Sequence, residues 1–276
     1  MPEIPDLEGI RGFLNARIVG AEITHADVFI PVVVRTGTAE FIASLTGNRF
    51  GEILRHGKFL LFALADEHVL VINAMLTGRF EYVDPKLKKR AKTVFTLTLD
   101  TGMQLRYVDE RVMGKIYLVH TDHLASVPMF AEMGPDALAV SEDEFRQRIK
   151  KFTGMTKNVL TNHKFIAGIG NAYSDEILFA ARIDPFRKRS TLSDEEIGHL
   201  YRGMRDVFDW ANPILADHFR EGLDYQEWRE HLKVHRKGFE GPKTNRDEGR
   251  CPRCGHQISQ ISPNQRVTSW CRNCQR

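Results

Sequence analysis

A change in hydrophobic periodicity near residue 134 divides the chain into two parts that must fold differently. In the first part, short runs rich in β-branched and aromatic residues, such as 59–64, 68–76 and 93–99, are separated by Gly, Asp and Asn. Such runs predict β-strands. Because no helical pattern lies between them, we expect an antiparallel sandwich or barrel, not a parallel sheet with crossover helices.

The breaker pair Gly134-Pro135 begins the second part, and Ser141 and Glu144 have the spacing of a helix capping box. From there through the segment 224–232, apolar residues recur at helical spacing, which predicts an all-α domain. A polar, Gly-containing stretch then leads to the C-terminal cysteines. The predicted domains are residues 1–132, 133–240 and 241–276.

All four cysteines lie in the last 26 residues and form two CxxC pairs with sixteen residues between them. This is the spacing of a structural zinc site with four thiolate ligands, in which two hairpin knuckles each supply two sulfurs. Two disulfides are the alternative, but they do not suit adjacent CxxC pairs in a chain without a visible signal peptide. The predicted ligands of one Zn²⁺ are Cys251, Cys254, Cys271 and Cys274.

The charge of the chain is unevenly distributed. The whole chain has a net charge of +3, yet residues 229–276 contain 11 Lys or Arg against 4 Asp or Glu. A basic C-terminal segment on a mildly acidic body favours a polyanionic partner, nucleic acid first, although a solvated basic face is the simpler alternative. No run approaches the ~20 apolar residues that span a bilayer. We therefore expect a cytoplasmic protein.

Two short segments each allow a structural and a chemical interpretation. Once the initiator Met is removed, Pro2 is the N-terminus with Glu3 beside it, but Pro and acidic residues can also simply begin a helix. Gly168, Gly170 and Asn171 precede an amphipathic helix. They form either a turn whose amides face a phosphate or a plain glycine loop.

Four segments together resemble the formamidopyrimidine-DNA glycosylase and endonuclease VIII family of base-excision-repair enzymes. Their order and spacing match across essentially the whole chain. The resemblance implies an antiparallel β-sandwich with an opening helix, a helical domain with a helix–two-turns–helix motif, and a C-terminal four-Cys zinc finger. It also implies a monomeric, nucleoid-associated enzyme whose partner is damaged double-stranded DNA. The segments are residues 2–8, 55–62, 168–185 and 264–275.

The resemblance implies a bifunctional glycosylase and AP lyase in which Pro2 is the nucleophile. An α-amino group titrates near ~8, against ~10.4 for a Lys side chain, so more of it is unprotonated and nucleophilic at neutral pH. Glu3 is implied as the acid/base that handles sugar protons. Lys58 and Arg266 are implied to assist β- and δ-elimination, respectively.

Further residues are implied to hold the DNA once the damaged base has been flipped out. Asn171 matches a phosphate contact of the helix–two-turns–helix, and Lys92 takes the place of a phosphate-contacting His. Met75 and Arg111 match side chains that fill the gap left by the base. The implied DNA contacts are Lys58, Met75, Lys92, Arg111, Asn171 and Arg266.

Several residues depart from the family pattern. Asp6 stands where Glu is usual, Asn73 where His is usual, and Met113 where the family has Phe. The segment after Gly222 is too short for the long loop that caps a flipped 8-oxoguanine, and an insertion precedes Cys251. We therefore expect hydantoins, oxidised pyrimidines and formamidopyrimidines to be preferred over 8-oxoguanine.

Two other classes of function compete with this interpretation. A damaged-DNA-binding paralogue without catalysis would keep the fold and the zinc finger, but the presence of Pro2, Glu3, Lys58 and Arg266 argues against it. A zinc-ribbon transcription or translation factor would explain only the C-terminal segment.

Overall fold

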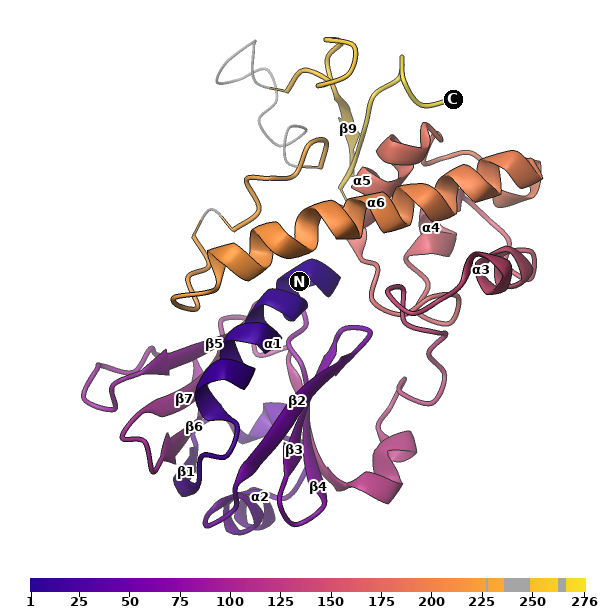
Figure 1. The fold of residues 1–276 in the computed structure, drawn as a ribbon. Coiled ribbons are helices and arrows are strands. Elements are labelled where there is room, and N and C mark those ends of the chain that lie inside the picture. The colour runs from indigo at the N-terminus through magenta and orange to yellow at the C-terminus, as the bar shows by residue number, and fades with distance from the viewer. Residues whose placement is uncertain (227, 236–248, 263–266) are drawn as a thin grey trace. The chain divides into compact units, whose positions relative to one another are not determined.

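The computed structural model describes residues 1–226, 228–235, 249–262 and 267–276 (Figure 1). The chain divides into two compact units. The sandwich unit contains residues 1–131 and 215–224, and the helical unit contains residues 132–214 and 225–276. The domain boundaries expected from the sequence stay a prediction. Among the described helices, none combines the length and the apolar character needed to cross a bilayer.

The sandwich unit consists of two four-stranded antiparallel sheets, with strand orders β1-β6-β7-β5 and β2-β3-β4-β8. Phe62 of one sheet meets Phe80 of the other with ring centroids 5.7 Å apart, so the aromatic core lies between the sheets. The antiparallel sandwich expected from the sequence is confirmed. Its strands are β1 (Ile23–Val28), β2 (Phe50–His56), β3 (Phe59–Leu64), β4 (His68–Asn73), β5 (Gly78–Val83), β6 (Thr93–Leu99), β7 (Gln104–Asp109) and β8 (Lys115–His120).

Helix α1 (Ile4–Ile18) opens the sandwich unit and packs along β2. The Asn15 side chain fixes this packing, because its Nδ2 donates to the Ile53 carbonyl at 2.9 Å and its Oδ1 accepts the Ile53 N–H at 2.8 Å. The predicted opening helix is thus confirmed. The remaining helical segments of the unit are α2 (Thr38–Leu45) and the 3₁₀ turns Pro31–Val33 and Thr121–Ser126.

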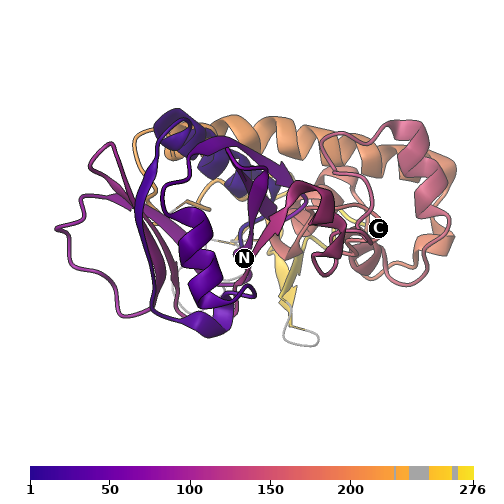
Figure 2. The same ribbon diagram turned by 90° about the horizontal axis from the view of Figure 1, so that it is seen from below.

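The helical unit contains helices between residues 142 and 214, as the sequence predicts, and the paired strands beside the C-terminal cysteines. The Ser141 hydroxyl accepts the Glu144 N–H at 3.2 Å and caps the first helix, as its sequence predicts. Figure 2 shows α6, in orange, as one long helix. The elements are α3 (Glu142–Ile149), α4 (Thr156–Leu160), α5 (Asn171–Ala181), the 3₁₀ turn Arg189–Thr191, most of α6 (Asp194–His218), β9 (Ser259–Ile261) and β10 (Thr268–Trp270).

The helix predicted over 224–232 is wrong. The described residues of this segment form turns, a bend and irregular backbone, and none of these described residues is helical. The His231 ring lies 5.4 Å from that of Trp210 in α6 and its Nε2 is 3.0 Å from the hydroxyl of Tyr173 in α5. Leu232 is buried. His231 thus contacts both α5 and α6, although its own segment is not helical.

Candidate active site and metal centre

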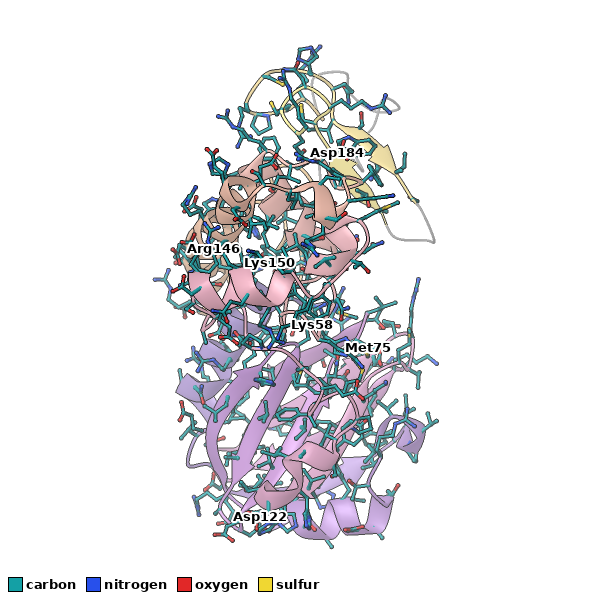
Figure 3. The ribbon with its side chains drawn as sticks, turned by 90° about the vertical axis from the view of Figure 1, so that its right-hand side faces the viewer. Lys58, Met75, Asp122, Arg146, Lys150 and Asp184 are labelled. Carbon is teal, nitrogen blue, oxygen red and sulfur yellow. The ribbon has the colours of Figure 1, made fainter. Side chains whose placement is uncertain are left out.

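The strand register brings the predicted catalytic lysine and a predicted DNA contact to the same end of the sandwich. Lys58 lies in the turn between β2 and β3, and Met75 lies in the turn after β4. Because Phe59 pairs with Asn73 across β3 and β4, these two turns are neighbours. Figure 3 shows Lys58 and Met75 at one end of the strands and Asp122 at the other.

Helix α1 leads the N-terminus toward this same end. Asn15 of α1 bonds to Ile53 in the middle of β2, whereas Glu8, closer to the start of α1, accepts the Arg55 Nε–H at 2.5 Å. Arg55 lies near the end of β2, so the first turn of α1 lies nearer to the β2–β3 turn than its last turn does. Pro2 therefore precedes a helix that begins close to the turn of Lys58.

Glu3 and Asp6 form the start of α1. The Glu3 backbone N–H donates to Asp6 Oδ2 at 2.7 Å, Pro5 lies in the first helical turn, and Glu3 is only 3% exposed. The helix-start interpretation of this segment is confirmed, with Asp6 as a capping side chain. The Glu3 side chain in turn accepts the backbone N–H of Asp6, which completes a capping box. This helix start is compatible with the chemical interpretation, in which Pro2 becomes the N-terminus.

The segment between β7 and β8 supplies two further predicted positions. Arg111 is exposed and Met113 is 38% exposed. The backbone N–H groups of Met113 and Gly114 donate to the carboxylate of Asp109 at 2.7 and 2.6 Å. The backbone of Lys92 also binds Asp109, because the Lys92 carbonyl accepts the Asp109 N–H at 2.9 Å. We call this assembly the loop end; it comprises residues 2–3, 57–58, 74–78, 92 and 109–114.

Sequence reasoning missed Leu76 in the loop end. Its side chain is 42% exposed, whereas the neighbouring Met75 is half-buried and has a φ of 48°. The run 68–76 looked like one continuous strand, but β4 ends at Asn73. Leu76 therefore presents an exposed apolar side chain at the turn that also carries the predicted DNA contact Met75. This exposure is what identifies it as a candidate site residue.

In the helical unit, a buried ion pair joins α4 and α5 to the β9–β10 pair. Lys157 Nζ donates to Asp175 Oδ1 at 2.6 Å, to Thr268 Oγ1 at 2.9 Å and to the Val267 carbonyl at 3.0 Å. Both charged side chains are nearly inaccessible, with 8% and 0% exposure. The position of β10 therefore depends on a lysine more than a hundred residues before it, which the sequence alone did not indicate.

The other oxygen of Asp175 extends the network. It accepts the Ser269 N–H at 3.0 Å and lies 2.8 Å from His235 Nδ1. The neighbouring Glu176 accepts the backbone N–H groups of Val234 and His235 at 2.7 and 2.9 Å. Burial raises the pKa of Glu176 above its usual range, although these N–H groups act in the opposite direction. Two adjacent acids of α5 thus anchor the segment 234–235 and strand β10.

Asn171 begins α5, and its position also touches the strand pair. Its Nδ2 donates to the Val267 carbonyl at 2.8 Å. This contact is compatible with both the plain-loop and the phosphate-turn interpretations of the segment. The Asn171 amide has a second N–H, which can donate to a phosphate. Arg266, which precedes Val267, lies outside the described residues.

The four cysteines converge at the end of the helical unit, and their sulfur atoms all lie within 4.8 Å of one another. Sulfur separations are 3.8 Å for Cys251 and Cys274 and 3.4 Å for Cys254 and Cys271. Tetrahedral zinc with Zn–S bonds of about 2.3 Å requires sulfurs about 3.8 Å apart, so the donor set fits such an ion.

Hydrogen bonding and burial shift the pKa values of these thiols in opposite directions. The backbone N–H of His256 lowers the pKa of Cys254 to about 5, whereas burial raises the pKa of Cys274 to about 12. Neighbouring thiolates repel one another, so the group can be fully ionised only around a positive ion.

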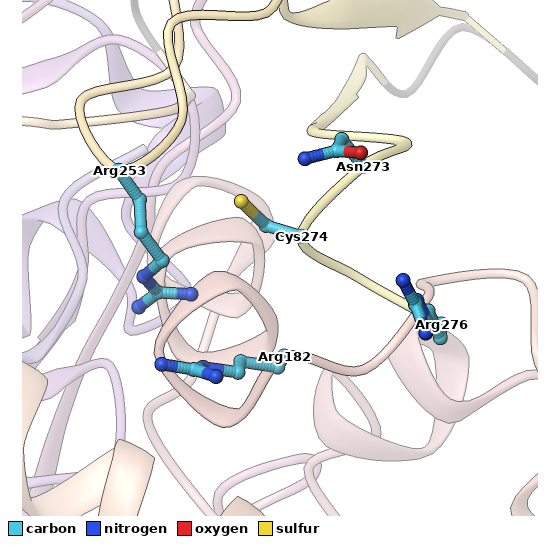
Figure 4. A pocket seen from close by; sticks show the side chains of 5 residues that line it. All are labelled: Arg182, Arg253, Asn273, Cys274 and Arg276. Carbon is cyan, nitrogen blue, oxygen red and sulfur yellow. The ribbon is translucent and has the colours of Figure 1, made fainter.

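Arginines surround one side of the cysteine cluster. A cavity of about 480 Å³ beside Cys274 is lined by Arg182, Arg253 and Arg276 together with Asn273 (Figure 4). Arg253 lies over the Phe179 ring, 4.2 Å from its centroid, and donates to the Phe179 carbonyl at 3.0 Å. Four thiolates around a divalent ion carry a net charge of about −2, which these guanidinium groups would offset.

Comparison with known proteins matches both units. A family model described as the formamidopyrimidine-DNA glycosylase N-terminal domain matches residues 1–116, and one described as the formamidopyrimidine-DNA glycosylase H2TH domain matches residues 133–214. The chain is 33% identical to the formamidopyrimidine-DNA glycosylase of Desulforamulus reducens and 31% identical to that of Pelotomaculum thermopropionicum. Each alignment covers 100% of this chain and 99% of the relative.

Solved structures give the same result. The Lactococcus lactis Fpg protein in complex with DNA containing N7-benzyl-Fapy-dG is similar over 100% of both chains, with a TM-score of 0.88 and 28% identity. The same protein in complex with DNA containing an abasic site gives a TM-score of 0.88 and 27% identity, again over 100% of both chains.

Proposed function

This chain belongs to the formamidopyrimidine-DNA glycosylase family of base-excision-repair enzymes, and we propose that it is a bifunctional DNA glycosylase and AP lyase with Pro2 as its nucleophile. The observation that carries the proposal is that the loop end brings the start of α1 close to the turn of Lys58. Helix α1 and the register of β3 and β4 support a site in which Pro2, Glu3 and Lys58 act together.

The chemistry follows from an N-terminal secondary amine. The lone pair of the Pro2 nitrogen forms a bond to C1′ of the deoxyribose, while the base leaves with the electron pair of its own C1′–N bond and takes up a proton. The Pro2 nitrogen gives up its proton, and cleavage of the C1′–O4′ bond, with a proton added to O4′, opens the ring and gives an iminium between C1′ and that nitrogen. Because this iminium is an electron sink, loss of a C2′ proton expels the 3′ phosphate, and loss of a C4′ proton then expels the 5′ phosphate.

The neighbouring residues handle protons and phosphates in this proposal. Glu3 delivers a proton to the opening sugar ring and removes one from C2′, since it is buried and directly follows the nucleophile in the chain. Lys58 holds a phosphate at the β2–β3 turn. Arg266 is proposed to hold the phosphates of the lesion nucleotide, and Asn171 to contact a phosphate from the start of α5.

The C-terminal cysteines are proposed to hold one structural Zn²⁺. The separations of Cys251 from Cys274 and of Cys254 from Cys271 support this ion. A site closed by four sulfurs has no open position for a substrate, so the metal would stabilise the fold of the segment around β9 and β10. Its contribution to repair would be to keep the residues between these strands in place.

The proposed substrates are hydantoins, oxidised pyrimidines, formamidopyrimidines and abasic sites in preference to 8-oxoguanine. In the helical unit, Leu232 and Val234 are buried and Glu176 binds the backbone of residues 234 and 235. These contacts leave little free chain in the segment 228–235 for a cap over a flipped base. Discrimination of 8-oxoguanine from guanine needs polar contacts of about 1–3 kcal/mol each, whereas poorly stacked lesions are cheaper to flip.

Borohydride trapping with abasic-site DNA tests the enzymatic proposal. We expect the mature protein to form a covalent complex and a form with an uncleaved N-terminal extension, which blocks the Pro2 amine, to form none. Equal trapping by both forms would refute Pro2 as the nucleophile. The absence of trapping in the mature protein would favour a damage-binding paralogue.

Single-turnover excision from matched duplexes tests the substrate preference. We expect hydantoin removal to exceed 8-oxoguanine removal opposite cytosine by about tenfold or more, as loss of one or two polar contacts predicts. Equal rates would mean that another segment forms the cap.

A further inference from the structure

One buried carboxylate organises the part of the loop end that carries the gap-filling side chains in the proposed function. Asp109 has no accessible surface. Its Oδ2 accepts the N–H groups of Met113 and Gly114, and its Oδ1 accepts the N–H of Arg111 at 3.3 Å. Because a carboxylate only accepts hydrogen bonds, its position fixes the directions of all the N–H groups that point at it.

Thr77 connects this carboxylate to a different loop. Its hydroxyl donates to Asp109 Oδ1 at 2.5 Å and accepts the Arg111 N–H at 3.0 Å. Thr77 belongs to the turn that carries Met75 and Leu76. The hydroxyl therefore ties the two loops that carry the proposed gap-filling side chains into one hydrogen-bonded assembly.

The backbone of Asp109 adds a third segment. Its N–H donates to the carbonyl of Lys92, the proposed phosphate contact that follows the basic loop 86–92. Three segments that are far apart in the chain, each with a proposed DNA contact, thus share one anchoring residue. These contacts all lie within the sandwich unit.

The atoms of this assembly are tightly packed, and two of its glycines have no space for a side chain. A Cβ on Gly78 would lie 2.0 Å from the Tyr107 hydroxyl oxygen, and one on Gly114 would lie 2.4 Å from the same oxygen. Met75 and Val112 have φ angles of 48° and 55°, a region that is costly for side chains of this kind. Such conformations persist only where surrounding contacts determine them.

We propose that Asp109 and Thr77 are positioning residues that fix the turn 74–77, the segment 110–114 and Lys92 as one preformed assembly for base extrusion. The inference rests on the proposed function. Its specific content is that extrusion of the base from a duplex depends on the assembly, whereas Schiff-base chemistry at an exposed abasic sugar does not.

The Thr77 hydroxyl offers the cleanest test. Thr77→Val removes both of its hydrogen bonds at nearly constant volume, and Thr77→Ser keeps the hydroxyl as a matched control. We expect Thr77→Val to slow single-turnover excision of a hydantoin from duplex DNA about tenfold, and to slow the fluorescence rise of 2-aminopurine opposite the lesion equally. Thr77→Ser should stay close to the parent in both.

The second part of the test is cleavage of an abasic site in a single-stranded oligonucleotide. This substrate has no base to extrude and no opposite strand across which a gap must be filled. We expect Thr77→Val to retain this reaction and its borohydride trapping within about twofold of the parent. Equal losses in both arms, or unchanged duplex excision, would overturn the inference. Failure of the parent protein to be trapped would instead refute the proposed function, so the two failures are distinguishable.

Discussion

Asp109 of the sandwich unit and Asp175 of the helical unit are both buried carboxylates, but their partners differ in charge. Asp109 accepts hydrogen bonds from backbone N–H groups and the Thr77 hydroxyl. Asp175 binds the Lys157 ammonium group, with His235 and the Ser269 N–H at its other oxygen. The first anchors loops through neutral donors, and the second joins strands to helices through an ion pair.

The two carboxylates should therefore respond differently to substitution. Removing one partner of a buried ion pair leaves an uncompensated charge and costs about 3–5 kcal/mol, whereas a hydrogen bond to a charged group is worth about 1.5–3 kcal/mol. We infer that changes at Asp175 act mainly on the stability of the helical unit. Changes at Asp109 act mainly on the geometry of the loop end.

The largest expected effect is loss of the proposed Zn²⁺, which should disturb the Asp175 network and leave the Asp109 network intact. Chelation or Cys251→Ser should remove folding free energy on the order of 10 kcal/mol from the segment around β9 and β10. Hydrogen exchange should become fast at the Ser269 N–H and stay slow at the Gly114 N–H. Loss of protection at both amides would show that the two units do not respond independently.

The buried ion pair should give the next largest effect. Asp175→Ala should destabilise the helical unit by about 3–5 kcal/mol in urea unfolding, because Lys157 keeps its charge in a buried site. The double variant Lys157→Met/Asp175→Leu removes both charges and should recover most of that loss. If the double variant is as unstable as Asp175→Ala, the charge is not the cause.

Asp109→Asn should lower the free energy of unfolding by a smaller amount, about 1.5–3 kcal/mol, since one oxygen acceptor remains. Metal content, measured by elemental analysis, should not change, because the described contacts of Asp109 lie in the sandwich unit. Asp175→Asn is the matched variant and should lose metal more readily. A loss of metal in Asp109→Asn would break the comparison.

The smallest effect concerns Glu176 and pH. Burial raises its pKa in the folded protein, so its contribution to stability is full below the ordinary value of 4.5 and is lost as pH rises through the folded pKa. Glu176→Gln keeps an oxygen for the Val234 and His235 N–H groups and has no such titration. Its unfolding free energy should depend less on pH above 4.5 than that of the parent. Parallel profiles would contradict the raised pKa.

Much of the fold could be predicted because the responsible signals are local. Alternating and continuous apolar runs gave the strands of the sandwich, the Ser141 cap began a helix, and the paired CxxC motifs converge as expected. The segment 224–232 could not be predicted correctly, since helical spacing also arises when side chains such as His231 pack on two separate helices.

The networks around the candidate site could not be predicted from spacing. Lys157 and Thr268 are 111 residues apart, and Thr77 and Asp109 are 32 apart, with no local motif joining either pair. Leu76 was missed because its exposure depends on where β4 ends. The proposed roles of Pro2 and Glu3 come only from the family resemblance, because the same residues also make an ordinary helix start.

The most direct test of the central claim is the identity of the residue that attacks the sugar. Mature protein would be reacted with abasic-site DNA, reduced with borohydride and digested, and the modified peptide would be sequenced by mass spectrometry. We expect the reduced sugar adduct on the nitrogen of Pro2, in a peptide that begins with Pro2. An adduct on Lys58 or another lysine, with an unmodified Pro2, would contradict the account.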